Sequence, residues 1–175
     1  MEESCIVGPL ASRLKHLARR LQRAAAQGQP NLLETIEAAQ SEALPAGGPK
    51  RRHCLQTVAK RVGFRSWTHA RDVLERANVT DRGTLMYRDS HGAISNIWCA
   101  SYAEAREARA SSGGFVLPYK HQFQIVQAPY IQWLGLDPAD PDWDAIGRDW
   151  VEPADVAAWT RITDHRLDQL LDGWP

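Results

Sequence analysis

Tyr119, Lys120 and His121 form the stretch of this sequence best suited to acid–base chemistry. A phenol, an amine and an imidazole in a row can exchange protons with a substrate if the fold holds them in a pocket. The polar residues that a neighbouring hairpin would bring to such a pocket are Tyr87, Arg88, Asp89 and His91. If the same three residues instead lie on an exposed turn, no pocket forms. Both arrangements are compatible with the sequence.

The cysteines are weaker candidates for chemistry. Cys54 follows a basic run at 50–52 and His53, and nearby cations would lower its thiol pKa. A small buried thiol at the start of a helix explains the same residue more simply. Cys99 lies in an apolar stretch and is expected in the core. Together with Cys5 these residues form no C-x-x-C pair, so we expect reduced thiols and a cytoplasmic protein.

A run of aspartates invites comparison with a calcium site. Its members are Asp137, Asp140, Asp142, Asp144 and Asp149. The spacing, the central glycine and the closing glutamate of an EF-hand are missing. Asp140 and Asp142 stand where a helix would begin, and carboxylates are favourable at that end of the helix dipole. We therefore predict no metal site, and no motif suggests a cofactor.

The charges are divided unequally along the chain. Residues 1–78 hold 13 Lys and Arg against 7 Asp and Glu, whereas residues 79–175 hold 8 against 14. The basic residues that could contact phosphates or an acidic partner are Arg13, Lys15, Arg19, Arg20, Arg23, Lys50, Arg51, Arg52, Lys60, Arg61 and Arg65. Binding through such a set would weaken steeply with salt. A solvated helix face, or docking onto the acidic half, is the alternative.

Six of the seven tryptophans follow residue 97. Most of them must be core residues, because a small domain needs large apolar areas to be stable. Trp143, Trp150 and Trp174 have the most polar sequence neighbours. If they are exposed, they would anchor a protein partner or a second copy of the chain.

Two regions of different periodicity must position these residues. Leu10, Leu14, Leu17 and Leu21 recur at helical spacing, and three further short helices are predicted before residue 78. The second region has the predicted order β-β-α-β-α-α-α, with strands at 84–88 and 94–100 around a DSHG turn. Its segments at 115–119 and 123–127 are strand-like and are interpreted as one strand bent near Pro118. The prediction is an α+β protein: a basic four-helix domain (1–78) and an acidic, Trp-rich domain (79–175) with a small antiparallel sheet covered by helices.

The stretch 55–75, LQTVAKRVGFRSWTHARDVLE, resembles a small helical module found ahead of some bacterial ankyrin-repeat and glyoxalase-like domains. The segment at 14–30 is similar to the helix that precedes this module, so the resemblance covers about residues 10–75. It implies structural roles only: Gly63 turns the chain, Phe64 and Trp67 pack, and Ser66 caps a helix. A helix-turn-helix is the alternative interpretation. His69 and Asp72 stand where that motif needs apolar residues, so a plain helical hairpin is favoured.

The function predicted from these features is a non-catalytic, cytoplasmic binding or regulatory protein of bacterial type. Its basic helices would meet an acidic macromolecule, with a protein partner or a homo-oligomer favoured. The second hypothesis is a protein that binds DNA or RNA through the same helices. The third is a small enzyme that uses the pocket of Tyr119, Lys120 and His121. No apolar run approaches the ~20 residues that span a bilayer, so no membrane partner is expected.

Overall fold

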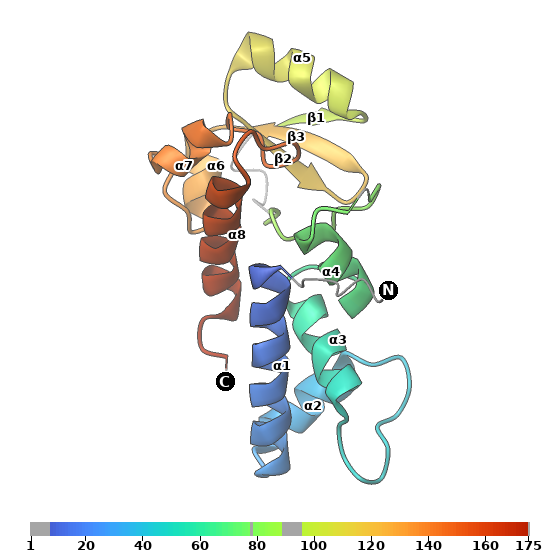
Figure 1. Cartoon of the computed structure of the whole chain (residues 1–175). Coiled ribbons are helices and arrows are strands. Elements are labelled where there is room, and N and C mark those ends of the chain that lie inside the picture. The colour runs from blue at the N-terminus through green and yellow to red at the C-terminus, as the bar shows by residue number, and fades with distance from the viewer. Residues whose placement is uncertain (1–7, 78, 89–95, 175) are drawn as a thin grey trace, which may run out of the picture. The chain divides into compact units, whose positions relative to one another are not determined.

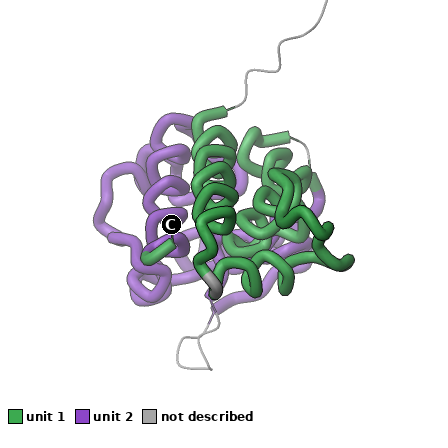
Figure 2. The backbone as a smooth tube through the Cα atoms, turned by 90° about the horizontal axis from the view of Figure 1, so that it is seen from below, with its two compact units in different colours: residues 1–79, 173–175 green, residues 80–172 purple. Residues whose placement is uncertain are grey.

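The computed structural model describes residues 8–77, 79–88 and 96–174 (Figure 1). The chain divides into two compact units, which Figure 2 distinguishes by colour: Met1–Val79 with Gly173–Pro175, and Thr80–Asp172. Helices fill the first unit, and a three-stranded antiparallel sheet with helices makes up the second. The α+β fold class predicted from the sequence is therefore confirmed.

Four helices build the first unit: α1 (Pro9–Ala26), α2 (Pro30–Ala38), α3 (Arg51–Arg61) and α4 (Trp67–Leu74). The predicted leucine spacing places Leu10, Leu14 and Leu21 in the core, whereas Leu17 is only half-buried. Pro30 begins α2, one residue before the predicted cap at Asn31. A proline fits a first helical position, because its missing N–H would have no partner there.

The connection from α3 to α4 follows the local signals in the sequence. Gly63 adopts a left-handed conformation (φ +95°), which ends α3 at low steric cost. Phe64 is buried, and the Ser66 hydroxyl oxygen accepts a hydrogen bond from the His69 N–H at 3.1 Å. The predicted turn and cap are confirmed.

The sheet of the second unit has the strand order β1-β3-β2, with β1 (Ile97–Cys99), β2 (Phe115–Tyr119) and β3 (Gln122–Val126). The strand-like segments predicted at 115–119 and 123–127 are confirmed as β2 and β3, but the interpretation of both as one bent strand is wrong. Lys120, at φ +53°, turns the chain so that Tyr119 pairs with Gln122 in a hairpin. Pro118 is tolerated because β2 is an edge strand of the sheet, with an isolated bridge between Val116 and Asp149 on its far side.

The prediction of a strand at 84–88 is also wrong. This segment is an irregular turn that buries Leu85 and Met86. The predicted DSHG turn at 89–92, with Asp89 and His91, lies outside the described residues.

Four helices accompany the sheet: α5 (Tyr102–Ser112), α6 (Ala128–Trp133), α7 (Pro141–Ala145) and α8 (Val156–Leu171). The predicted capping box at the start of α5 is confirmed, since the Glu104 N–H donates to Ser101 Oγ and the Ser101 N–H donates to Glu104. Helix α5 covers one face of the sheet, where Ala105 packs into a cluster with Phe123 and Ile125. Within the described residues, no helix is both long and apolar enough to cross a membrane.

The prediction that Trp143 and Trp150 anchor an interface is wrong, because both are core residues. They are 1% and 2% exposed, and the indole N–H groups donate to the Asp137 carbonyl oxygen and to Thr163 Oγ1. Trp174 is half-buried and carries the guanidinium of Arg61 over its ring at 5.6 Å. The most exposed indoles are instead those of Trp98 and Trp133, at 47% and 37%.

Candidate polyanion-binding face

The solvent-facing side of α1 is basic along its length. Arg19, Arg20 and Arg23 are exposed, while Leu14, Ala18 and Leu21 of the same helix are fully buried. Residues three or four apart share a helix face, so these arginines lie close together. No acidic residue occurs in α1, and within the described part of the chain none of the three arginines makes an ion pair. Their charges are directed at solvent or at a partner.

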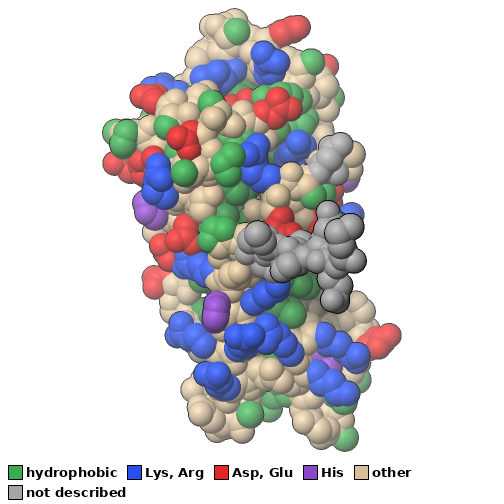
Figure 3. All heavy atoms as spheres, viewed as in Figure 1, with side chains coloured by type: hydrophobic (Ala, Val, Ile, Leu, Met, Phe, Trp, Pro, Cys, Tyr) green, Lys and Arg blue, Asp and Glu red, His purple; other side chains and the backbone are tan. Residues whose placement is uncertain are grey.

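Helix α3 continues this basic surface. Gln22 Nε2 donates to the Pro49 carbonyl oxygen at 3.4 Å, and the Lys15 ammonium lies 5.8 Å from the centre of the Trp67 ring. These contacts place the start of α3 near the C-terminal half of α1, and the start of α4, which follows α3, near its N-terminal half, so α1 and α3 are antiparallel. Figure 3 shows Lys and Arg side chains gathered over α1 and α3.

One side of α3 carries Arg52, Gln56 and Lys60, spaced four residues apart, and Arg52 and Lys60 are exposed. The Gln56 side chain donates to the Arg65 carbonyl oxygen at 2.9 Å, which places the Arg65 backbone beside the middle of this row. We call Arg19, Arg20, Arg23, Arg52 and Lys60 the basic face.

The structure does not bring the whole predicted basic set into one site. Arg13, Lys15 and Arg51 are half-buried, and Lys50 is the exposed residue that precedes α3. Arg61 stacks on Trp174, which takes it away from the row of Arg52 and Lys60.

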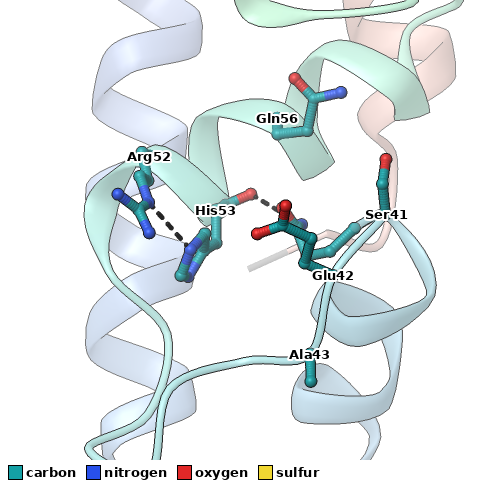
Figure 4. A pocket seen from close by; sticks show the side chains of 7 residues that line it. Ser41, Glu42, Ala43, Arg52, His53 and Gln56 are labelled. Atoms are coloured by element: carbon teal, nitrogen blue, oxygen red, sulfur yellow. Dashed lines mark hydrogen bonds between the residues drawn. The ribbon is translucent and has the colours of Figure 1, made fainter.

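A cavity of about 490 Å³ borders the basic face between the end of α2 and α3 (Figure 4). Its lining residues are Gln40, Ser41, Glu42, Ala43, Arg52, His53 and Gln56. In the sequence His53 stands out only as the neighbour of Cys54, and no local motif marks the cavity. Its walls come from the first residues of the loop after α2 and from α3.

His53 has two N–H groups directed at its ring. The Lys50 backbone N–H lies 3.1 Å from Nδ1, and Arg52 Nε lies 3.1 Å from Nε2. A neutral imidazole has only one acceptor nitrogen, so it cannot accept both hydrogen bonds at once. When Nδ1 accepts from Lys50, Nε2–H and the Arg52 N–H are two donors side by side. An oxyanion oxygen would satisfy both of them.

We expect His53 to make stability depend on pH. Burial, with Arg52 and then Lys50, lowers its pKa below the ordinary 6.5. The unfolded chain then takes up a proton near pH 6.5 that the folded chain resists. The stabilisation is full above pH 6.5 and is lost as pH falls through the lowered folded-state value. Urea unfolding measured at several pH values should show a smaller loss of stability at acid pH for His53→Gln than for the wild type. The glutamine side chain keeps an acceptor for the Lys50 N–H.

The matched control for this experiment is His16→Gln, on the exposed side of α1. It should retain the wild-type pH dependence. If the free energy of unfolding changed equally with pH in the wild type and in His53→Gln, the assignment of this pH dependence to His53 would be contradicted.

Helix α4 is poorly suited to reading bases in a groove. Its Arg71 pairs with Asp72 at 2.9 Å and lies 3.9 Å from Glu75. His69 is buried beneath Phe64, with ring centres 5.4 Å apart. A recognition helix needs outward-facing donors that are not already compensated by acids. The geometry therefore agrees with a plain helical hairpin.

The predicted acid–base pocket is not formed by its three central residues. Lys120 and His121 are exposed on the two-residue turn between β2 and β3. Tyr119 packs instead with Tyr87 and Trp98, at 4.4 and 5.4 Å between ring centres. An exposed turn neither excludes water nor converges polar groups, so the prediction of a pocket here is wrong.

Cys54 and Cys99 are both buried, and burial raises the pKa of each thiol. A raised pKa disfavours the thiolate, which is the reactive form. The basic residues before Cys54 do not reverse this effect, so neither residue is an activated nucleophile.

No protein-family model matches this chain, and comparison with curated proteins and with solved structures found no match either.

Proposed function

We propose that this protein is a non-catalytic, cytoplasmic binding protein whose basic face holds the phosphate backbone of a nucleic acid. The observation that carries the proposal is the group of exposed arginines on α1, Arg19, Arg20 and Arg23, without ion pairs in the described part of the chain. Exposed cations left uncompensated attract a polyanion, and binding releases the counterions that the polyanion had condensed.

The size of the basic face suits a nucleic-acid backbone. The helix rises 1.5 Å per residue, so Arg19 to Arg23 spans about 6 Å. One strand of DNA presents about two phosphates over that length, at roughly 3.4 Å each. Arg52 and Lys60 extend the contact onto α3. Since α4 offers no base-reading surface, we expect little dependence on sequence.

An acidic protein surface is the alternative partner for the same cations. The burial of Trp143 and Trp150 removes two of the aromatic anchors that favoured a protein partner. A reduced cytoplasmic setting agrees with the free thiols of Cys54 and Cys99.

Fluorescence anisotropy of labelled generic duplex DNA and single-stranded RNA with the full chain tests the proposal. The predicted result is binding whose logarithm falls linearly with the logarithm of salt concentration, with a slope of about −3 to −5 on duplex DNA for four or five engaged phosphates. Polyglutamate of matched charge should compete weakly. Binding of labelled polyglutamate with no nucleic-acid binding would assign the face to an acidic protein instead.

A further inference from the structure

Arg166 of α8 is a buried cation without a carboxylate partner in the described residues. Its side chain is 4% exposed, and it lies among Ile162 and Leu167 on the buried side of the helix. Arg166 Nε donates to the Leu85 carbonyl oxygen at 3.0 Å, and Nη1 donates to the Leu134 carbonyl oxygen at 2.6 Å. A charge removed from water normally requires a counter-charge. The protein supplies two neutral carbonyls instead.

The third nitrogen of the guanidinium opens onto a cavity. Nη2 of Arg166 has no hydrogen-bond partner among the described residues. The side-chain atoms that lack a partner and are also fully enclosed are Glu75 Oε1 and Asn96 Oδ1 in the described part of the chain, and Nη2 is not among them. It therefore retains accessible surface. A cavity of about 400 Å³, within the range of small-molecule sites, is lined by this side chain. The two backbone carbonyls hold the guanidinium in a fixed orientation, so the site is pre-organised.

A second arginine lines the same cavity. Arg88 donates from Nη1 to the Trp133 carbonyl oxygen at 2.9 Å, and its guanidinium lies 4.8 Å from the centre of the Trp133 ring. Burial, with the nearby charge of Arg88, lowers the pKa of Arg166 to about 10, so Arg166 remains cationic at neutral pH. Two like charges at one cavity repel each other, and a bound anion would relieve that repulsion.

The remaining walls are aromatic and apolar, with amides at the edge. Tyr87, Trp133 and Leu170 supply the apolar surface, and Gln169 supplies an amide. Gly135 is left-handed at φ +79°, and a Cβ there would lie 2.6 Å from Gln169 Oε1. A side chain at position 135 would therefore require the Gln169 side chain to move.

We propose that this cavity binds a small organic oxyanion, with its anionic group on Arg166 Nη2 and Arg88 and its flat apolar body against Trp133. Planar oxyanions match the fork of a guanidinium, and an aromatic wall favours a planar body. The site lies wholly within the second unit and does not depend on the basic face. Its success or failure is therefore separate from that of nucleic-acid binding.

Titration of the full chain followed by the NMR signals of the tryptophan indole N–H groups tests this site. The probes are benzoate, phenyl phosphate, inorganic phosphate and the neutral benzamide. We expect saturable shifts of the Trp133 signal with benzoate or phenyl phosphate, at affinities at least ten-fold tighter than for benzamide or inorganic phosphate. The better of the two aromatic anions identifies the carboxylate or phosphate class. Equal responses to benzoate, phenyl phosphate and benzamide, or no response, would overturn the proposal.

Arg88→Gln should weaken binding of the aromatic anion at least ten-fold. It leaves intact the backbone hydrogen bonds of Arg88 with the Tyr130 hydroxyl. The matched control is Arg148→Gln, another exposed arginine stacked on an aromatic ring, Phe115, and paired with Asp144. It should bind like the wild type. Arg166→Lys keeps the charge but loses the fork and should also bind weakly. Wild-type affinity in Arg88→Gln would contradict the assignment.

Discussion

Replacing Trp143 by alanine is expected to lower the free energy of unfolding of the second unit by about 3–5 kcal/mol. The indole is 1% exposed and packs edge-on against Phe115, with ring centres 5.0 Å apart. Its N–H donates to the Asp137 carbonyl oxygen at 3.0 Å, so truncation also removes this hydrogen bond. A loss of this size is a large part of the 5–15 kcal/mol that typically stabilises a small domain.

Chemical denaturation of the full chain, followed by circular dichroism, measures this effect. Trp98→Ala is the matched control, since its indole is 47% exposed, and it should cost about 1 kcal/mol or less. Trp143→Phe retains part of the packing and provides a variant that folds if the alanine variant does not. If Trp143→Ala were as stable as Trp98→Ala, the burial described for Trp143 would be incorrect.

Replacing Arg19, Arg20 and Arg23 together by glutamine should weaken nucleic-acid binding by about two to three orders of magnitude near 0.1 M salt. Each phosphate contact contributes about 0.9 to the salt slope, so the slope should flatten by about 2.7 if all three arginines engage. The three side chains are exposed, and glutamine favours the helix nearly as well as arginine. The fold should therefore survive the change. Anisotropy titrations at several salt concentrations measure both quantities.

The matched control removes the same charge from the second unit through Arg106→Gln, Arg148→Gln and Arg161→Gln, all at exposed positions. It should leave the salt slope unchanged. Equal losses of affinity in the two triple variants would mean that net charge, and not the basic face, governs binding.

The parts of the fold that short-range chemistry determines were predictable from the sequence. Gly63, Ser66 and the Ser101–Glu104 pair set turns and caps within a few residues of themselves. The strand predicted at 84–88 failed because Leu85 and Met86 are buried by tertiary contacts and not by pairing in the sheet. Apolar residues in a short run satisfy both descriptions, and only the fold distinguishes them.

Sequence neighbours were a poor guide to the burial of tryptophan. Trp143 stands between Asp142 and Asp144, which suggested an exposed site. In the short helix α7 the Asp142 carboxylate pairs with Arg161 at 2.6 Å, while the indole is buried. Adjacent helical residues point in different directions, so polar neighbours say little about the residue between them.

The two candidate sites differ in how visible they are in the sequence. The α1 part of the basic face follows from the helical period, because the buried residues leave Arg19, Arg20 and Arg23 on the exposed side. Arg166 could be noticed only as a charge in the apolar register of α8, four residues after Ile162. Its partners at Leu85 and Leu134 are 81 and 32 residues away, so the fold alone identifies the cavity.

The central claim is that the basic face of α1 and α3 contacts the phosphate backbone. The most direct test is backbone NMR chemical-shift mapping of the full chain with a short generic DNA duplex. If the basic face binds the phosphate backbone, the largest shifts are expected at Arg19, Arg20 and Arg23, with smaller ones at Arg52 and Lys60. Shifts confined to α4 or to the second unit, or no shifts at low salt, would contradict it.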